Sequence, residues 1–134
     1  MSAFYKIEKE RRLVMTSGSG VLTREDILGH QERLLNDPDF DPTFSQLIDF
    51  TQLTNTDITP ADVQTAALRN IFSPSSRRAL LVKNDFQYGL ARMFEIHRDL
   101  AGETGIRVFR VLDEALDWVL TTDTISQDAT SISG

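Results

Sequence analysis

Short apolar runs alternate with segments of helical periodicity along most of this chain. Runs of strand length lie at residues 47–50, 79–82 and 106–109, and each is followed by a segment in which apolar residues recur every three or four positions. Strands that alternate with helices favour a mainly parallel sheet, because each helix returns the chain to the edge where the next strand begins. The sequence therefore predicts an α/β fold with helices packed on the sheet faces.

The beginning of the chain follows a different pattern. Two short apolar runs, at residues 4–7 and 13–16, are separated by a charged stretch, which is typical of an antiparallel hairpin. Gly18, Ser19 and Gly20 are expected to end the second strand. The predicted fold class is α/β, with a mixed, mainly parallel β-sheet, an N-terminal antiparallel hairpin and helices on its faces.

Helix starts are marked by capping signals. Thr23 precedes a helical pattern and Asp26 lies in its first turn, as in a capped helix. Thr59 and Asp62 repeat this spacing before the next helical segment. The longest helix is predicted at residues 86–100. The residues expected on its inner face are Phe86, Leu90, Met93, Phe94, His97 and Leu100.

Length and composition fit one domain. The chain has 134 residues, of which 40% are hydrophobic and 25% charged, and this is enough to bury one core. We expect residues 1–120 to form that single domain. Residues 121–134 are rich in Ser and Thr and contain no basic residue, so a disordered tail is expected there.

Charge and cysteine content argue against several classes of function. The absence of cysteine removes disulfides, thiol catalysis and cysteine-ligated zinc, and it suits a reducing compartment. A net charge of −6 opposes binding to nucleic acid. The N-terminus lacks the apolar segment of a secretory signal, and no run approaches the ~20 apolar residues that span a bilayer. We therefore expect a cytoplasmic protein that is not transmembrane.

One polar cluster has the composition of an anion site. Ser73, Ser75 and Ser76 supply hydroxyl groups directly before Arg77 and Arg78, next to a predicted strand. Hydroxyl donors beside two guanidinium groups are what a phosphate or a carboxylate requires. The alternative is a polar loop whose arginines pair with nearby acids of the chain.

Aromatic residues of the longest predicted helix offer a second candidate surface. Phe86 and Tyr88 are candidate contacts for a ligand or a partner; alternatively, Phe86 belongs to the core and Tyr88 lies on the surface. His97, in the same helix, is expected to be a hydrogen-bonded core histidine. No motif indicates a catalytic, metal or cofactor site, and whether carboxylates and His97 converge in space is left open by the sequence.

The order of these motifs resembles that of the SpoIIAA-like proteins. The residues that carry the resemblance are the hairpin, Leu22-Thr23-x-x-Asp26, Asp39-Phe40-Asp41-Pro42, Leu47-Ile48-Asp49-Phe50, and the run from Arg78 to Val82 with Gly89 to Met93. SpoIIAA-like proteins are bacterial relatives of STAS domains, the fold of anti-sigma factor antagonists, and are compared with CRAL-TRIO lipid-transfer domains. The resemblance covers roughly residues 4–120 and implies a STAS-like fold.

The resemblance also implies two modes of action. In STAS antagonists, phosphorylation of a serine at a helix start controls partner binding. The corresponding stretch here is Asp57-Ile58-Thr59-Pro60, which lacks the usual Asp-Ser-Ser pattern but makes Thr59 a candidate phosphoacceptor. A helix cap is the alternative role for Thr59. CRAL-TRIO relatives hold an apolar ligand between helices and sheet.

Two functions follow from these observations. The preferred one is a non-enzymatic regulatory or protein-interaction module, with Thr59 and the loop at residues 73–78 in its contact surface. The alternative is a carrier or sensor of a small apolar or anionic ligand, which would use Arg77, Arg78 and the longest helix. No cofactor is expected, and a homodimer is compatible with either function.

Overall fold

The structure of this chain is a computed structural model. It describes residues 3–69, 71–100 and 105–121, and for residues 63, 66–68 and 97–100 it describes the backbone only. The predicted tail from residue 122 onward and the side chain of His97 therefore lie outside the described residues.

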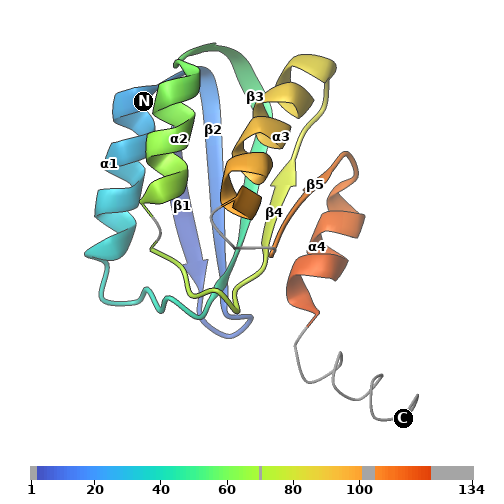
Figure 1. Cartoon of the computed structure of the whole chain (residues 1–134). Helices are drawn as coiled ribbons and strands as arrows, with labels where there is room; N and C mark the ends of the chain where they lie inside the picture. Colours follow the sequence, from blue (N-terminus) through green and yellow to red (C-terminus); the bar gives the residue numbers. More distant parts are fainter. Residues whose placement is uncertain (1–2, 70, 101–104, 122–134) are drawn as a thin grey trace.

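Five strands of the described chain form one mixed sheet in the order β1-β2-β3-β4-β5 (Figure 1). They are β1 (Ala3–Glu8), β2 (Leu13–Thr23), β3 (Ser45–Asp57), β4 (Arg78–Leu81) and β5 (Ile106–Phe109). β1 and β2 pair antiparallel, while the other neighbouring strands pair parallel. The predicted fold class is confirmed, including the antiparallel hairpin at its start.

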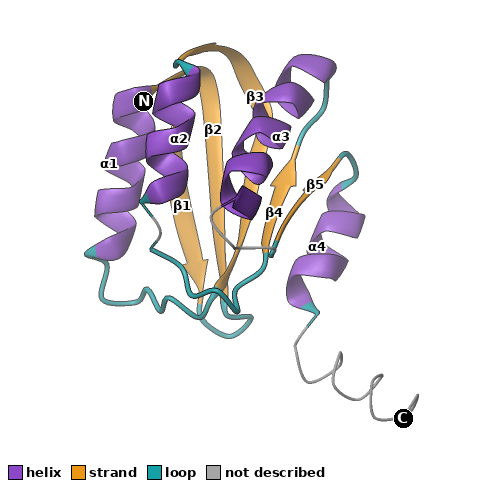
Figure 2. Ribbon diagram, viewed as in Figure 1, coloured by secondary structure: helices purple, strands orange, loops and turns teal. Residues whose placement is uncertain are grey.

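The helices divide between the two faces of the sheet (Figure 2). The helices α1 (Arg24–Leu35), α2 (Pro60–Leu68) and α3 (Asp85–Leu100) lie side by side on one face, and α4 (Leu112–Leu120) packs on the other. The connections through α1, α2 and α3 all step in the same direction across the sheet. Because such crossovers are right-handed, they place these three helices on the same face. No helix in the described part of the chain is long and apolar enough to cross a membrane.

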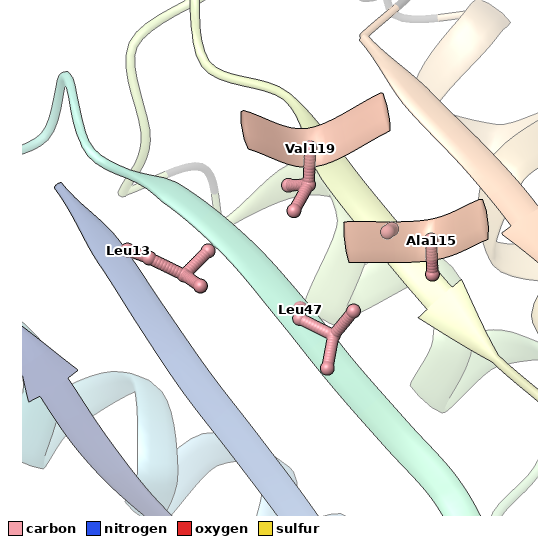
Figure 3. Packing of buried hydrophobic residues seen from close by; sticks show 5 residues of the cluster. Leu13, Leu47, Ala115 and Val119 are labelled. Atoms are coloured by element: carbon pink, nitrogen blue, oxygen red, sulfur yellow. The ribbon is translucent and has the colours of Figure 1, made fainter. Parts of the chain in front are cut away.

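The pleat of the strands separates two layers of core. Successive strand residues point to opposite faces, so neighbouring residues enter different layers. Below α4 the buried cluster consists of Leu13, Leu47, Ala79, Ala115 and Val119 (Figure 3). On the other face, Val14 packs with Leu34 of α1, and Leu80 packs with Ala91 of α3. Each strand therefore supports both layers.

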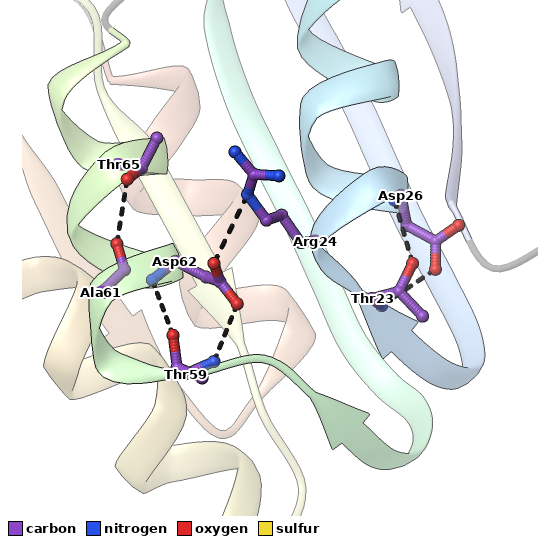
Figure 4. A network of polar contacts seen from close by, with 7 residues as sticks. All are labelled: Thr23, Arg24, Asp26, Thr59, Ala61, Asp62 and Thr65. Carbon is purple, nitrogen blue, oxygen red and sulfur yellow. Dashed lines mark hydrogen bonds and ion pairs between the residues drawn. The ribbon is translucent and has the colours of Figure 1, made fainter.

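Both predicted capping signals form helix N-caps (Figure 4). The hydroxyl of Thr23 accepts a hydrogen bond from the Asp26 amide at 3.1 Å, and the Asp26 carboxylate accepts one from the Thr23 amide at 3.0 Å. Thr59 and Asp62 make the same reciprocal pair. Nε of Arg24 lies 3.4 Å from Oδ1 of Asp62, so an ion pair links the starts of α1 and α2.

The prediction that Gly18, Ser19 and Gly20 end the second strand is wrong. β2 continues to Thr23 and stays paired with β3 across two register shifts. Gly20 has a φ of 70°, a backbone conformation that glycine adopts readily, and this allows the strand to bulge without ending. The sheet is consequently longer at this end than the sequence predicts.

The placement of Phe86 on the inner face of α3 is also wrong. Its side chain is 47% exposed. The buried position belongs to Gln87, whose amide donates to the carbonyl of Leu53 at 3.0 Å and accepts from the Lys83 amide at 2.8 Å. Because satisfied hydrogen bonds permit a polar side chain to be buried, the inner face begins one residue later than the apolar pattern predicts.

Candidate functional site

A cavity of about 120 Å³ lies between the sheet and the helices α1 and α3. Its described walls come from β2, β3 and β4 on one side, and from α1, α3 and the segment after α2 on the other. Ile48, Phe50 and Phe94 line it and are only partly buried, although they lie between two layers of structure. The space between these layers is therefore accessible to a small molecule.

One end of the cavity is polar. Its polar wall residues are Thr16 of β2, His30 of α1, Gln46 of β3 and Arg78 of β4, with exposed fractions of 8%, 8%, 3% and 7%. The hydroxyl oxygen of Thr16 accepts a hydrogen bond from Nε2 of Gln46 at 2.8 Å and lies 3.0 Å from Nε2 of His30. Gln46 and Arg78 are register partners on adjacent strands, so their side chains share this face of the sheet.

The guanidinium of Arg78 contacts two aromatic rings at this end. Its central carbon lies 5.1 Å from the ring centre of Phe72 and 5.9 Å from that of Phe94. Ring faces attract a guanidinium and fix its orientation, and the planar fork of N–H donors matches the geometry of a carboxylate or a phosphate. Because arginine stays protonated in proteins, the polar end carries a permanent positive charge.

The opposite end of the cavity is apolar. Along β3 the wall residues run from Gln46 through Ile48 and Phe50 to Leu53. Leu22 of β2 adds a further apolar side chain at the far end. The cavity therefore changes from polar and positively charged, where the parallel strands begin, to apolar, where they end.

His30 is neutral at physiological pH. Burial lowers its pKa from 6.5 to about 4, and the nearby Arg33 guanidinium acts in the same direction. Its ring also contacts the Tyr5 ring edge-on, with 5.5 Å between the ring centres. The neutral ring completes the hydrogen-bonded polar end without adding a second positive charge.

Replacing His30 with Gln is expected to flatten the dependence of stability on pH. The folded protein resists protonation of His30 until about pH 4, whereas the unfolded chain takes up that proton near pH 6.5. The free energy of unfolding should therefore fall by about 2 kcal/mol from pH 7 to pH 5 through this residue alone. Urea titrations of both proteins at these two pH values measure the difference, and parallel losses would contradict the burial of a neutral His30.

Comparison with solved structures identifies the architecture. The chain is similar to a crystal structure of an uncharacterized protein from the DUF3478 family with a SpoIIAA-like fold, from Shewanella loihica PV-4. The TM-score is 0.61 and the sequence identity 21%, over 88% of this chain and 94% of the other. The fold is SpoIIAA-like. No protein-family model matches the chain, and no curated protein matches it.

In this SpoIIAA-like fold the two adjacent arginines of the predicted anion cluster are separated. Arg78 lines the cavity, whereas Arg77 lies at a different hollow, with its guanidinium over the ring of Trp118. Their side chains diverge because successive residues at a strand point to opposite faces. The cluster at residues 73–78 is therefore not one site.

The serines of that cluster lie in the loop before β4. The hydroxyl of Ser76 is buried and donates to the carbonyl of Pro42 at 2.8 Å, so this hydrogen bond holds the loop before β4 against the segment before β3. The hydroxyl oxygens of Ser73 and Ser75 are 2.9 Å apart, and Ser75 reaches the same hollow as Arg77. A ligand role for these serines stays a prediction.

Phe86 and Tyr88 are absent from the described wall of the cavity. Both are exposed, and the Arg110 guanidinium lies 4.9 Å from the ring centre of Tyr88 while it pairs with Asp85. The surface position predicted for Tyr88 as the alternative is confirmed. Contact of either aromatic residue with a partner stays a prediction.

Thr59, the candidate phosphoacceptor, is exposed at the start of α2. Its hydroxyl oxygen accepts a hydrogen bond from the amide of Asp62 at 3.1 Å, so the alternative role of helix cap is present in the structure. Phosphorylation of Thr59 stays a prediction.

The site residues predicted from the sequence do not include Thr16, His30 and Gln46, which lie with Arg78 at the polar end of the cavity. Each has an apolar residue next to it on the same face of its strand or helix, namely Val14, Leu34 and Ile48 respectively. The available signal was a polar side chain at a core position of the periodic pattern, on three separate elements. The sheet register and the packing of α1 bring them together.

Proposed function

We propose that this protein is a non-enzymatic binding module that holds a small amphipathic molecule with an anionic end in the cavity. The observation that carries this proposal is the difference between the two ends of the cavity: Arg78 lies at one end, and the wall at the other end is apolar. An anionic head group would lie at Arg78, and the apolar body would extend along β3 toward Leu53.

Electrostatics favours an anion at the polar end. Among the described residues that line the cavity there is no Asp or Glu, whereas Arg78 lies at its polar end. Arg69 also lines the cavity and forms an ion pair with Glu32. A charge-assisted hydrogen bond from a buried guanidinium is about twice as strong as a bond between neutral groups. Gln46, beside Arg78, donates one of its two side-chain N–H groups to Thr16, and the other can donate to an oxygen of the same head group.

The volume of the cavity favours a small ligand. An apolar cavity of about 150 Å³ holds one benzene molecule, so a cavity of about 120 Å³ encloses about five carbon atoms of a chain. Because the cavity opens to solvent, a chain of about eight carbon atoms can extend beyond the enclosed part. This argues for a medium-chain carboxylate and against a whole membrane lipid. A straight hydrocarbon chain would also bury apolar surface against the wall formed by Ile48, Phe50 and Leu53, which favours binding.

The polar groups at the cavity support binding better than catalysis. A general base requires a titratable group with a pKa near the working pH, and the pKa of His30 is about 4. Its Nε2 is engaged with the Thr16 hydroxyl. A regulatory or protein-interaction role of this SpoIIAA-like module stays a prediction.

Calorimetric titration with straight-chain carboxylates from butanoate to dodecanoate tests the proposal. We expect affinity to peak near octanoate with a Kd of about 100 µM, which is about 0.5 kcal/mol for each non-hydrogen atom of the ligand. Octanamide, which has the same shape without the charge, should bind at least about tenfold more weakly. The absence of saturable binding across the whole series would contradict the proposal.

A further inference from the structure

A second hollow, of about 220 Å³, lies where β3 and β4 begin, on the side of α4. We call it the basic hollow, and its charged and hydroxyl-bearing wall residues are Arg11, Arg12, Arg77, Thr43, Ser45, Ser75 and Thr121. Among the described residues that line it there is no carboxylate. The hydroxyl and guanidinium groups come from the β1–β2 turn, from the loops before β3 and β4, and from the end of α4.

We propose that the basic hollow binds the phosphate group of a small soluble molecule. Guanidinium groups match phosphate oxygens with paired N–H donors, and the Ser45 hydroxyl supplies a further donor from another direction. A tetrahedral anion uses donors that surround it better than a planar carboxylate does, and here the donors of Arg12, Ser45 and Arg77 come from three segments of the chain. This site is independent of the cavity and of the function proposed for it.

Arg12 is held in place before any ligand arrives. Its φ of 53° is left-handed, which is rare for a residue with a side chain and is found preferentially at functional sites. The backbone is fixed there because the Arg12 amide donates to the Lys9 carbonyl at 3.1 Å and the Arg12 carbonyl accepts from the Ser45 amide at 3.0 Å. The β1–β2 turn therefore fixes the direction of the Arg12 side chain toward the basic hollow, in spite of local backbone strain.

The guanidinium of Arg12 keeps most of its donors for a ligand. It lies 5.2 Å from the ring centre of Phe44 and donates one hydrogen bond, from Nη2 to the Thr43 hydroxyl at 2.5 Å. A guanidinium has five N–H donors, and no other described residue accepts from this one. The Ser45 hydroxyl accepts from the Arg77 amide at 3.2 Å, which leaves the hydroxyl proton to donate.

Arg77 and Arg11 set the local charge. Nη1 of Arg77 donates to the carbonyl of Trp118 at 3.1 Å, so the negative end of the α4 dipole is covered by a cation. Arg11 forms two hydrogen bonds with Glu8, at 3.0 Å and 2.9 Å. Asp41 binds the amide and hydroxyl of Thr43, outside the lining of the hollow. Arg12 is therefore the main anion-binding group, and Arg77 adds positive charge beside it.

Titration with inorganic phosphate and with glycerol 3-phosphate, at constant ionic strength adjusted with chloride, tests this site. We expect saturable shifts of the amide NMR signals around Thr43, Ser45 and Ser75. Arg12→Gln and Arg77→Gln should each weaken binding about tenfold or more, and Arg12→Lys, which keeps the charge but not the fork, should give a smaller loss. Tighter binding of glycerol 3-phosphate than of phosphate would identify a phosphate monoester as the ligand, and the reverse order would identify free phosphate.

Arg110→Gln is the matched control, because it removes an exposed arginine that pairs with Asp85 near the start of α3. Its phosphate affinity should equal that of the unmodified protein. Absence of saturable shifts with both probes, or equal losses in Arg110→Gln and Arg12→Gln, would overturn the proposal. Arg78→Met should leave phosphate binding unchanged, because Arg78 lines the cavity and not the basic hollow. A loss of phosphate binding can therefore be distinguished from a loss of carboxylate binding in the cavity.

Discussion

Arg78→Met is expected to lower the affinity for octanoate about 100-fold while it changes the affinity for octanamide less than about threefold. Among the described wall residues, the Arg78 guanidinium is the only charged group beside Gln46 at the polar end. Loss of one partner from a buried charge pair costs about 2–5 kcal/mol. Methionine keeps an apolar stem, and its sulfur can pack against Phe72 and Phe94, so the apolar part of the cavity remains.

Arg77→Met is the matched control for this result. It removes the same charge from the adjacent residue, whose side chain lies at the basic hollow. Octanoate affinity should be nearly unchanged in this variant, and Arg78→Lys should retain part of it. Equal losses in Arg77→Met and Arg78→Met would show a general effect of net charge and would contradict a head-group site at Arg78. Circular dichroism of each variant establishes that the fold is retained.

Gly105→Ala is expected to lower the free energy of unfolding by about 3 kcal/mol. A Cβ atom at Gly105 would lie 2.5 Å from the backbone carbonyl oxygen of Ser76, which is closer than any ordinary contact. The chain cannot move away freely, because the Gly105 carbonyl accepts a hydrogen bond from the Arg78 amide at 2.7 Å. Overpacking against a fixed backbone carries a penalty of about this size.

Gly89→Ala gives the opposite expectation and serves as the control. Gly89 lies inside α3, and a Cβ atom there would meet nothing within 4 Å. Alanine in a helix is more stable than glycine by about 0.8–1 kcal/mol, so this variant should be more stable than the unmodified protein. Urea denaturation of both variants measures the two effects. Stability losses of similar size would contradict the close approach of the β4 start to Gly105.

The parts of the fold that depend on neighbouring residues were predictable from the sequence. The hairpin and the two capping boxes are set by residues within a few positions of one another, such as Thr23 with Asp26. Periodicity also predicted the alternation of strands and helices. Where the sequence prediction failed, a contact between residues far apart in the sequence determined the structure. Gln87, for example, is buried because its side-chain amide donates to the carbonyl of Leu53.

The cavity was beyond prediction for the same reason. Thr16, Gln46 and His30 come from three elements and form one hydrogen-bonded group only through the sheet register and the packing of α1. The divergence of Arg77 and Arg78 follows from strand alternation once the start of β4 is known. The sequence predicted anion-binding residue types at this place, but not their separation into two sites.

Isotope-edited NMR with ¹³C-labelled octanoate is the most direct test of the proposed cavity ligand. If the cavity holds the molecule, nuclear Overhauser contacts should join its terminal methyl group to Phe50 and Leu53, and its first methylene group to protons of Gln46 and Phe72 at the polar end. Contacts with surface residues only, or no contacts at saturating octanoate, would contradict a binding function for this cavity.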